Sequence, residues 1–153
     1  MPEIPKILHR FTTQRGINLI KRFEGFSAVV YKCIAGFDTV GWGHVVRQGE
    51  VFASPITEEQ GEELLKKDLF LSERAVLRLI SVPLTDGEFD SLVSFTFNLG
   101  SGTLQRSTLR QKLNRNEDRL EVANEFLKWI FAGGKKSKGL LRRRMAEREL
   151  FLT

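Results

Sequence analysis

The sequence predicts an α+β fold in which a small sheet comes first and a larger helical part follows. β-branched and aromatic residues form a short run between Ala28 and His44. From residue 57 onward apolar residues recur at helical spacing, and two capping sequences, Thr57-Glu-Glu-Gln60 and Thr85-Asp-Gly-Glu88, mark helix starts. Early strands followed by late helices are typical of α+β proteins, and a cleft between the two parts is a common ligand site.

The first third of the chain contains one helix and one hairpin. Apolar residues at helical spacing predict a helix from about Thr13 to Glu24. The runs Ala28 to Cys33 and Thr39 to His44 predict the two strands of a β-hairpin. Glycines at 41 and 43 would weaken an ordinary strand, so we expect the backbone there to approach a neighbouring strand or a ligand closely.

The rest of the chain is expected to be helical. At 153 residues it suits one domain, 1–153, with a small lobe at about 25–56 and a helical lobe at about 57–153 that includes the N-terminal helix. Five helices are expected in the later part: one from Thr57 that Pro83 breaks, one from Thr85 to Gly100, a short one capped by Ser107, one running through Leu120 and Ile130 to Gly133-Gly134, and one from Leu140 to Leu152.

Composition excludes several classes of protein. Hydrophobic residues make up 41% and charged residues 28%, as in soluble globular proteins, and no apolar run approaches the roughly 20 residues that span a bilayer. The single Cys cannot form an internal disulfide, and His9 and His44 are far apart, so we expect no metal and no cofactor. No signal peptide is evident; Met1 to Phe11 could form one or two amphipathic turns that pack on the domain or touch a membrane, and packing is favoured.

Positive charge is concentrated near the C-terminus. The chain carries 24 Lys and Arg against 19 Asp and Glu, and the segment from Lys135 to Arg144 holds basic residues without an acid. Such a patch attracts polyanions such as nucleic acid, anionic lipid or an anionic cell-wall polymer. It is equally consistent with a solvated helix end, because Lys and Arg favour helix C-termini and surfaces.

Glu24 is the candidate for acid–base chemistry. It ends the first expected helix, where the helix dipole is negative, and its neighbours Phe23 and Phe26 are apolar. Both influences favour the protonated carboxyl and would raise its pKa toward the range of a general acid. The alternative is an exposed Glu whose position is tolerated. A Cys33–His44 nucleophile pair is also conceivable, although the two residues lie on opposite strands of the hairpin.

A resemblance to a known family covers nearly the whole chain. The segment from Phe23 to His44 resembles the catalytic segment of phage-type lysozymes, or endolysins, of glycoside hydrolase family 24. The signature of that family is a Glu, an Asp or Cys nine positions later, and a Thr six after that; here these are Glu24, Cys33 and Thr39. Later segments resemble the lambdoid branch: Phe95-Thr-Phe-Asn-Leu-Gly100, Arg106-Ser-Thr-Leu-Arg-Gln-Lys-Leu-Asn114, Glu125-Phe-Leu-Lys-Trp129 and Gly139-Leu-Leu-Arg-Arg-Arg144.

The resemblance implies the lysozyme-like α+β fold and a reaction. The family cleaves the β-1,4 bond between N-acetylmuramic acid and N-acetylglucosamine in peptidoglycan. Glu24 would protonate the leaving oxygen, while Cys33 and Thr39 would handle the attacking water. Thr39 can only orient water, and a free thiol with a pKa near 8.5 is a poor base at neutral pH, so Cys33 would act as a base, through its position, or as a nucleophile. Asp38 is a weaker rival carboxylate.

Other positions carry over from the family more loosely. The resemblance implies an ion pair between His44 and Asp68 that ties the sheet to the first long helix. Val45, Phe97 and Thr108 match positions that line the substrate cleft, although Phe97 is at least as well explained by core packing.

We therefore expect a soluble, monomeric muramidase that lyses bacteria and whose partner is peptidoglycan rather than nucleic acid or a membrane. It would stay in the host bacterial cytoplasm until it is released to the cell wall. Two alternatives stay open: a non-catalytic wall-binding relative, and a basic helical domain that binds nucleic acid, which accounts for the charge but not for the hairpin.

Overall fold

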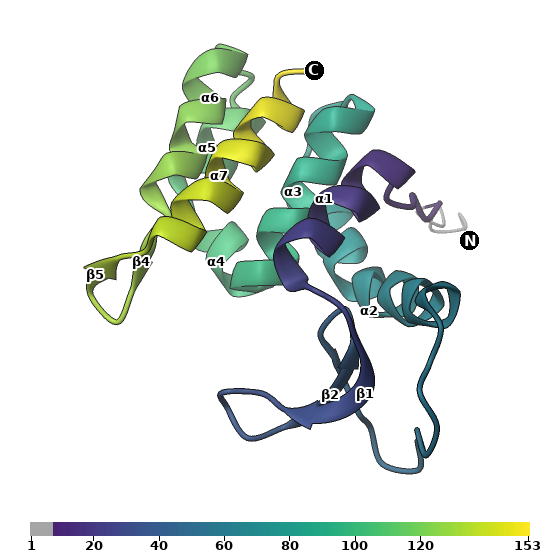
Figure 1. Cartoon of the computed structure of the whole chain (residues 1–153). Helices are drawn as coiled ribbons and strands as arrows, with labels where there is room; N and C mark the ends of the chain where they lie inside the picture. The colour runs from purple at the N-terminus through teal and green to yellow at the C-terminus, as the bar shows by residue number, and fades with distance from the viewer. Residues whose placement is uncertain (1–7) are drawn as a thin grey trace.

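The structure, a computed structural model, describes residues 8–153 and has a small sheet on one side of a group of helices (Figure 1). The predicted α+β class is confirmed. The elements in chain order are α1 (Gln14–Glu24), β1 (Ser27–Lys32), β2 (Asp38–Gly41), β3 (His44–Val45), α2 (Glu58–Leu79), α3 (Asp86–Leu99), α4 (Ser101–Arg106), α5 (Thr108–Asn114), α6 (Arg119–Glu125), a 3-10 turn (Phe126–Lys128), β4 (Phe131–Ala132), β5 (Lys135–Lys136) and α7 (Lys138–Phe151).

The first sheet has three antiparallel strands in the order β1-β2-β3. Thr39 pairs with Tyr31 on one side and with Val45 on the other. The expectation of a second strand from Thr39 to His44 was wrong in one respect, because β2 ends at Gly41 and His44 opens a third strand. Gly41 and Gly43 have φ of 67° and 77°, a left-handed backbone that lets the chain turn back within three residues.

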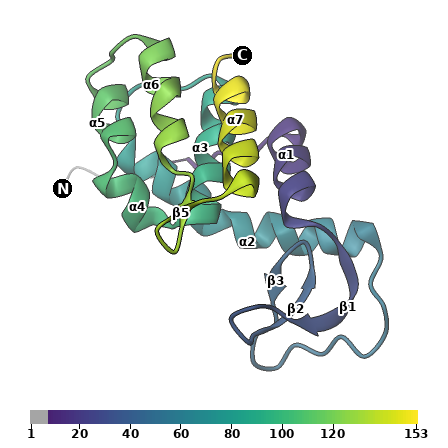
Figure 2. The same cartoon turned by 60° about the vertical axis from the view of Figure 1, so that its left-hand side comes forward.

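The sheet lies against α2 (Figure 2), and two aromatic rings anchor it there. Phe26 and Trp42 lie with their ring centroids 4.6 Å apart, and both face Gly61 of α2. A Cβ at position 61 would lie 2.9 Å from the Phe26 ring, so only glycine lets α2 come this close. Lys21 of α1 covers the Trp42 ring at 4.3 Å and closes the contact from the other side.

The hydrophobic core lies among the helices, with α3 at its centre. Every residue of α3 from Gly87 to Thr96 is buried, and α1, α2 and α7 all pack on this helix (Figures 1 and 2). The fully buried aromatic and aliphatic side chains of the core include Phe89, Leu92, Phe95, Leu104, Leu109, Leu113 and Phe126. Removing this much apolar surface from water is the main free-energy source for the fold.

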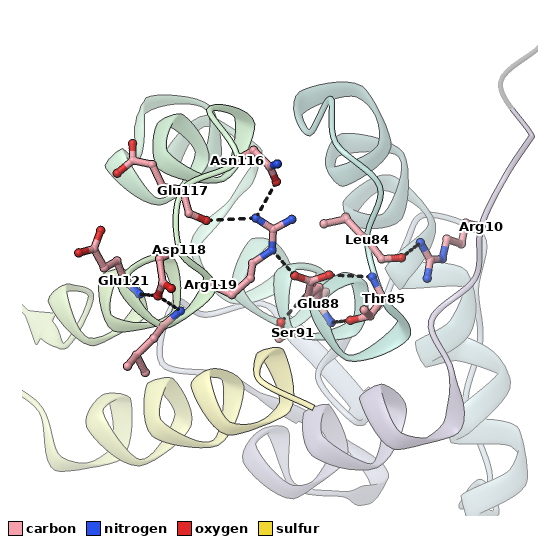
Figure 3. Close-up of polar contacts among 11 residues, drawn as sticks. Arg10, Leu84, Thr85, Glu88, Ser91, Asn116, Glu117, Asp118, Arg119 and Glu121 are labelled. Carbon is pink, nitrogen blue, oxygen red and sulfur yellow. Dashed lines mark hydrogen bonds and ion pairs between the residues drawn. The ribbon is translucent and has the colours of Figure 1, made fainter.

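Both capping sequences form the caps that they predict. The Thr57 and Thr85 hydroxyls accept hydrogen bonds from the backbone N–H groups three residues later, and Gln60 and Glu88 accept in return from the cap backbone. The second oxygen of Glu88 also binds Arg119 Nε at 2.6 Å, and Arg119 reaches Asn116 as well (Figure 3). The buried Glu88 thus joins the start of α3 to the start of α6.

The segment before α1 is an extended strap rather than a helix. Residues 8–13 contain no helical turn, which corrects the amphipathic turns expected there, and residues 1–7 of that expectation lie outside the described residues. The Thr12 backbone and hydroxyl donate to the buried carboxylate of Glu73 at 2.6 and 2.7 Å, and His9 Nε2 lies 2.9 Å from its other oxygen. The described part of the segment therefore packs on α2, although Leu8 and Phe11 are exposed.

Two parts of the C-terminal half differ from expectation. The helix α4 follows α3 directly after Gly100, and no separate helix was expected there. The helix expected to reach Ile130 ends at Glu125 instead, and Gly133-Gly134 form the two-residue turn of a small β4–β5 hairpin. Their φ values of 57° and 79° are those of the hairpin turns that twist in the same sense as the strands. Within the described part, no helix combines the length and apolar character that a bilayer crossing needs.

Candidate active site

Glu24 lies where α1 ends and faces a pocket. Gly25 follows with φ of 71° and ends the helix, so the chain leaves toward β1 while the Glu24 side chain stays on the helical side. The side chain is 23% exposed, which keeps it accessible to a ligand but largely out of bulk water. The pocket has a volume of about 580 Å³ and runs from the end of α1 to the start of α7; its lining includes Arg22, Phe23, Asn98, Ser137, Leu140, Arg142 and Arg143.

The partner of Glu24 is Arg143 of α7. Arg143 Nη1 donates to Glu24 Oε1 at 2.8 Å, across 119 positions of sequence. The Arg143 side chain is only 5% exposed, so this is an oriented contact rather than a mobile surface pair. The contact fixes the direction in which the carboxyl points into the pocket.

Sequence reasoning missed this role of Arg143 and counted it in a surface patch. The structure corrects that assignment: Arg143 and Arg144 are buried, whereas Lys135, Lys136 and Lys138 are exposed. One signal was available, because an acid, Glu147, follows Arg143 at the i,i+4 spacing that pairs side chains along a helix. A solvated patch does not need that partner, but a buried guanidinium does.

The turn between β2 and β3 contacts the Glu24 carboxyl on the side away from Arg143. A Cβ built on Gly43 would lie 3.1 Å from Glu24 Oε2, so the carboxyl lies directly against this backbone. The φ of 77° at Gly43 also excludes ordinary side chains there. The close approach predicted for this pair of glycines is present at Gly43, and its neighbour is the candidate acid.

Cys33 and Thr39 are neighbours across the start of the hairpin. The Cys33 N–H donates to the Phe37 carbonyl at 2.9 Å, and the Thr39 hydroxyl donates to the same carbonyl at 3.0 Å. A backbone hydrogen bond at Phe37 is the main cause that lowers the pKa of the Cys33 thiol below its ordinary value. Burial opposes this effect, and the Thr39 hydroxyl and the backbone at Ala35 and Gly36 add to the lowering. The surroundings of Cys33 therefore increase the thiolate fraction, which the sequence alone left open.

The three candidate catalytic residues occupy two separate places, with Glu24 in one and Cys33 and Thr39 in the other. Glu24 lines the α1–α7 pocket together with Arg143, while the residues that line this pocket do not include Cys33 or Thr39. The two places are joined by β2, which starts beside Thr39 and runs into the turn that meets Glu24. Val45 pairs with Thr39 in the adjacent strand and is exposed, whereas Thr39 is buried, so a ligand at this strand edge meets Val45 first.

His44 lies between two carboxylates. Its Nδ1 is 2.8 Å from Asp68 Oδ2, the contact expected from the resemblance, and its Nε2 is 2.9 Å from Glu50 Oε1. A neutral imidazole has one N–H, so both contacts can be hydrogen bonds only when the ring is protonated. Burial alone lowers the pKa of His44, but the hydrogen bonds and charges of Glu50 and Asp68 outweigh it and the pKa lies above its ordinary value.

Glu50 was missed because it belongs to a loop without periodic pattern. Its backbone hydrogen bond from Arg47 and its contact with His44 lower the pKa of Glu50. With both ring nitrogens held by carboxylates, His44 has no free nitrogen for Cys33, which counts against the nucleophile pair considered above. Asp38, the rival carboxylate, is exposed and bound to Lys32 at 2.9 Å.

The remaining cleft candidates are spread over the helices. Phe97 packs against the hydrophobic core, in line with its alternative interpretation. Thr108 is exposed at the start of α5 and lines a small pocket of about 110 Å³ with Trp129 and Lys128. Among residues 8–153, no group of three His, Cys, Asp or Glu side chains is placed to hold a metal ion.

Comparison with known proteins matches residues 21–147 to the phage lysozyme family. The endolysin of Bacillus phage B103 is 44% identical over 146 residues, which are 92% of this chain and 54% of that relative. The endolysin of Salmonella phage P22 is 39% identical over 144 residues, which are 92% of this chain and 97% of the relative. The crystal structure of a P22 lysozyme mutant has a TM-score of 0.86 at 37% identity and covers 94% of this chain and 99% of its own. The chain thus spans about half the length of the Bacillus phage relative and nearly all of the P22 endolysin. This chain belongs to the phage lysozyme family.

Proposed function

We propose that this chain is an endolysin that hydrolyses the β-1,4 bond between N-acetylmuramic acid and N-acetylglucosamine in bacterial peptidoglycan. The observation that carries the proposal is the position of Glu24: a partly exposed carboxyl at a pocket mouth, held by a buried guanidinium and pressed against the turn of the sheet. Glycoside hydrolysis needs one carboxyl fixed beside the leaving oxygen, and this arrangement supplies it.

Glu24 acts as the general acid. It gives its proton to the glycosidic oxygen as the bond to the anomeric carbon breaks, and it holds the negative charge afterwards in contact with Arg143. The limited exposure of Glu24 reduces competition from bulk water for that proton.

Cys33 and Thr39 position and activate the attacking water. Their side chains are mutual neighbours, and the Thr39 hydroxyl hydrogen is already donated to the Phe37 carbonyl. One water can therefore donate to the Thr39 oxygen and to the Cys33 sulfur, which leaves its lone pair free for attack. The lowered pKa of the thiol makes Cys33 a better base than a free cysteine at neutral pH. Attack by this water on the sugar face opposite Glu24, with its proton passing to the Cys33 thiolate, inverts the anomeric carbon. Direct attack by the sulfur would form a covalent glycosyl-enzyme intermediate, and its hydrolysis by a water that Glu24 deprotonates would give net retention.

Two finer points belong to the same proposal. The chain works as a monomer, because the Glu24 pocket and the Cys33–Thr39 pair are built from one copy. It resides in the host cytoplasm until another factor opens the membrane, and it then acts at the cell wall, where its substrate is. Fractionation of host cells before lysis tests the location, and sedimentation of the purified chain tests the monomer.

The experiment is clearing of purified cell walls, with the new reducing ends identified chemically. Glu24→Gln is expected to lower the rate by about a thousandfold or more, because the amide cannot donate a proton to the leaving oxygen. Cys33→Ser is expected to lower it by about tenfold to hundredfold, because a hydroxyl is a far weaker base than a thiol with a lowered pKa. Glu59→Gln, an exposed glutamate at the start of α2, is the matched control and should clear as wild type does.

Each result has a definite meaning. Reducing ends on N-acetylmuramic acid support the proposed bond, and reducing ends on N-acetylglucosamine contradict it. A Glu24→Gln variant that clears walls as fast as wild type removes Glu24 from the mechanism. A wild-type chain that binds walls and releases no reducing ends would establish the non-catalytic alternative.

A further inference from the structure

A chain of buried charges continues behind Glu24, between the central helix α3 and the C-terminal helix α7. It consists of Arg143, Glu147 and Arg144 of α7 with Ser94 of α3. Three of the four side chains are completely buried, and Arg143 is nearly so. The proposed mechanism uses only the first member of this group, so the role of the others needs an explanation.

Glu147 is the centre of the group. Ser94 Oγ donates to Glu147 Oε2 at 2.6 Å, and Arg143 Nε lies 3.3 Å from the same oxygen. The other oxygen, Oε1, is 3.3 Å from Arg144 Nε. Glu147 therefore contacts two adjacent arginines of its own helix at the same time.

Both arginines contact residues that line the Glu24 pocket. Arg143 Nη1 donates to Glu24, and Arg144 Nη2 donates to Asn98 Oδ1, another lining residue. Arg143 Nη2 also donates to the Ser94 carbonyl at 3.3 Å, so the guanidinium is held along three of its directions. The buried Glu147 carboxylate thus contacts Arg143, which lines the pocket, and Arg144, which holds the pocket residue Asn98.

The electrostatic consequence follows from counting charges. A buried guanidinium whose only carboxylate partner is Glu24 would stabilise the ionised form of that group strongly. The negative charge of Glu147 partly neutralises the positive charge of Arg143. Glu24 therefore keeps a positioned hydrogen-bond donor whose electrostatic attraction for a negative charge on Glu24 is reduced. Burial raises the pKa of Glu147, while the charges of Arg144 and Arg143 and the hydrogen bond from Ser94 oppose that rise. Contact with two guanidiniums favours the ionised carboxylate.

We propose that Glu147 is a positioning residue for catalysis: it orients Arg143 toward Glu24 and Arg144 toward Asn98, and it balances the charge of Arg143 beside the candidate acid. The inference rests on the proposed function of Glu24. Glu147 does not line the pocket, so it acts only through the arginines. The charged side chains that share the pocket with Glu24 are Arg22 of α1 and Arg142 and Arg143 of α7.

The test compares pH–rate profiles of wild type, Glu147→Gln and Glu147→Asp on soluble peptidoglycan chains. In Glu147→Gln the amide keeps the size of the side chain but not its charge. We expect kcat to fall about tenfold to hundredfold with KM unchanged, and the alkaline limb of the kcat profile to move to lower pH by about one unit. Glu147→Asp keeps the charge, so its alkaline limb should stay at the wild-type position while kcat falls, because the carboxylate is one methylene farther from Arg143.

The matched control is Glu88→Gln, which neutralises another buried glutamate with an arginine partner, Arg119, at 2.6 Å. It should lose stability but keep the wild-type pH profile, since Glu88 lies at the start of α3 and outside the pocket. Thermal unfolding of every variant sets an assay temperature at which all are folded. If Glu147→Gln does not fold, Glu147→Asp decides, and an unchanged kcat in that variant overturns the proposal.

The failures of the two proposals are distinguishable. If Glu24→Gln is inactive and Glu147→Gln has the wild-type pH–rate profile, the proposed function is retained and the positioning role of Glu147 is overturned. Glu24→Gln active overturns the proposed function, and with it the basis of this inference. A profile shift in Glu147→Gln that Glu147→Asp reverses and Glu88→Gln lacks supports the positioning role.

Discussion

At the scale of single residues, the backbone around Glu24 is as constrained as its side-chain partners. Gly43 has only a hydrogen where any other residue would place a Cβ, and a Cβ there would lie 3.1 Å from Glu24 Oε2. Arg143 approaches the other oxygen from the opposite lobe. The carboxyl is therefore held between a turn of the sheet and a helix of the larger lobe, and a small displacement of either changes its direction.

Replacing Gly43 with Ala tests this arrangement. The left-handed φ should cost about 1–2 kcal/mol of folding free energy, and the added methyl group should push the Glu24 carboxyl away from the turn, which lowers kcat about tenfold or more. Calorimetry and wall clearing measure the two effects separately. Gly134→Ala, with φ of 79° and open space around its Cβ, introduces a similar left-handed φ and should keep its activity. Equal activity losses in both variants would mean that the Glu24 contact is unimportant.

The sequence could identify a site residue only where its partners lie close to it along the chain. Glu24, Cys33 and Thr39 form a short-range pattern, and their spacing along the chain is enough to recognise it. The role of Arg143 could not be recognised in this way, because its partner is 119 positions away and a run of basic residues has the same appearance whether it is buried or solvated. Glu50 was invisible for a related reason: a loop carboxylate carries no periodicity that separates it from other surface acids.

At the scale of elements, the His44 contacts clamp the sheet to α2 and to the loop that leaves β3. His44 belongs to β3, Asp68 to α2, and Glu50 to the following loop. Because the ring is buried and both nitrogens face carboxylates, the clamp is complete only with a protonated ring. The small lobe is thus attached partly by a titratable group.

The clamp predicts a pH dependence of stability. Since the pKa of His44 is higher in the folded state than its ordinary value of 6.5, its contribution is fully present below pH 6.5 and is lost as the pH rises through the folded value. Asp68→Asn should destabilise the chain by about 1–3 kcal/mol at pH 6 and by less at pH 9. Denaturant unfolding across this range measures both.

The control for the clamp is Asp86→Asn, whose exposed pair with Arg10 at 2.9 Å involves no histidine. Its small effect on the free energy of unfolding should not change between pH 6 and pH 9. A loss in Asp68→Asn that is the same at both pH values would contradict a protonated His44, and an NMR titration of the ring would show the same directly.

The starts of helices with capping sequences could be predicted from the sequence. The ends of elements that depend on packing against other elements could not. Thr57 and Thr85 begin helices where the local sequence requires it, since their side chains satisfy backbone N–H groups. The end of α6 depends instead on packing: Phe126 inserts into the core beside Phe95 and Phe151, and the chain then leaves through the Gly133-Gly134 turn. Tertiary packing therefore determines where α6 ends, and helical periodicity alone predicts a helix that is too long.

At the scale of the whole molecule, the net charge of +5 is unevenly distributed. The exposed part of the C-terminal basic segment is the β4–β5 hairpin and the first turn of α7, where Lys135, Lys136 and Lys138 lie next to Ser137 at the pocket. A cationic surface beside a catalytic pocket raises the rate at which a polyanion arrives there. Peptidoglycan carries anionic groups, so we expect this surface to act on encounter rather than on chemistry.

Changing Lys135, Lys136 and Lys138 together to Gln should slow wall clearing several-fold at low ionic strength, about 0.01 M, and should have little effect near 0.5 M, where the Debye length is short. Turbidity measured against salt concentration provides the check. Changing Lys66, Lys67 and Arg78 of α2 to Gln removes the same charge elsewhere and should have a smaller effect. If both triple variants respond equally to salt, net charge matters and the position of the hairpin does not.

The direction of α7 has a consequence for molecules built from this chain. The helix starts at the pocket with Lys138 and ends at Phe151, about 21 Å farther along its axis, where Thr153 contacts Arg15 and the start of α3. A wall-targeting module fused after Thr153 would emerge at the far end of that helix and leave the mouth of the pocket unobstructed. The same module inserted at the β4–β5 turn would lie beside the pocket that Glu24 lines and would compete with the polymer for access to it.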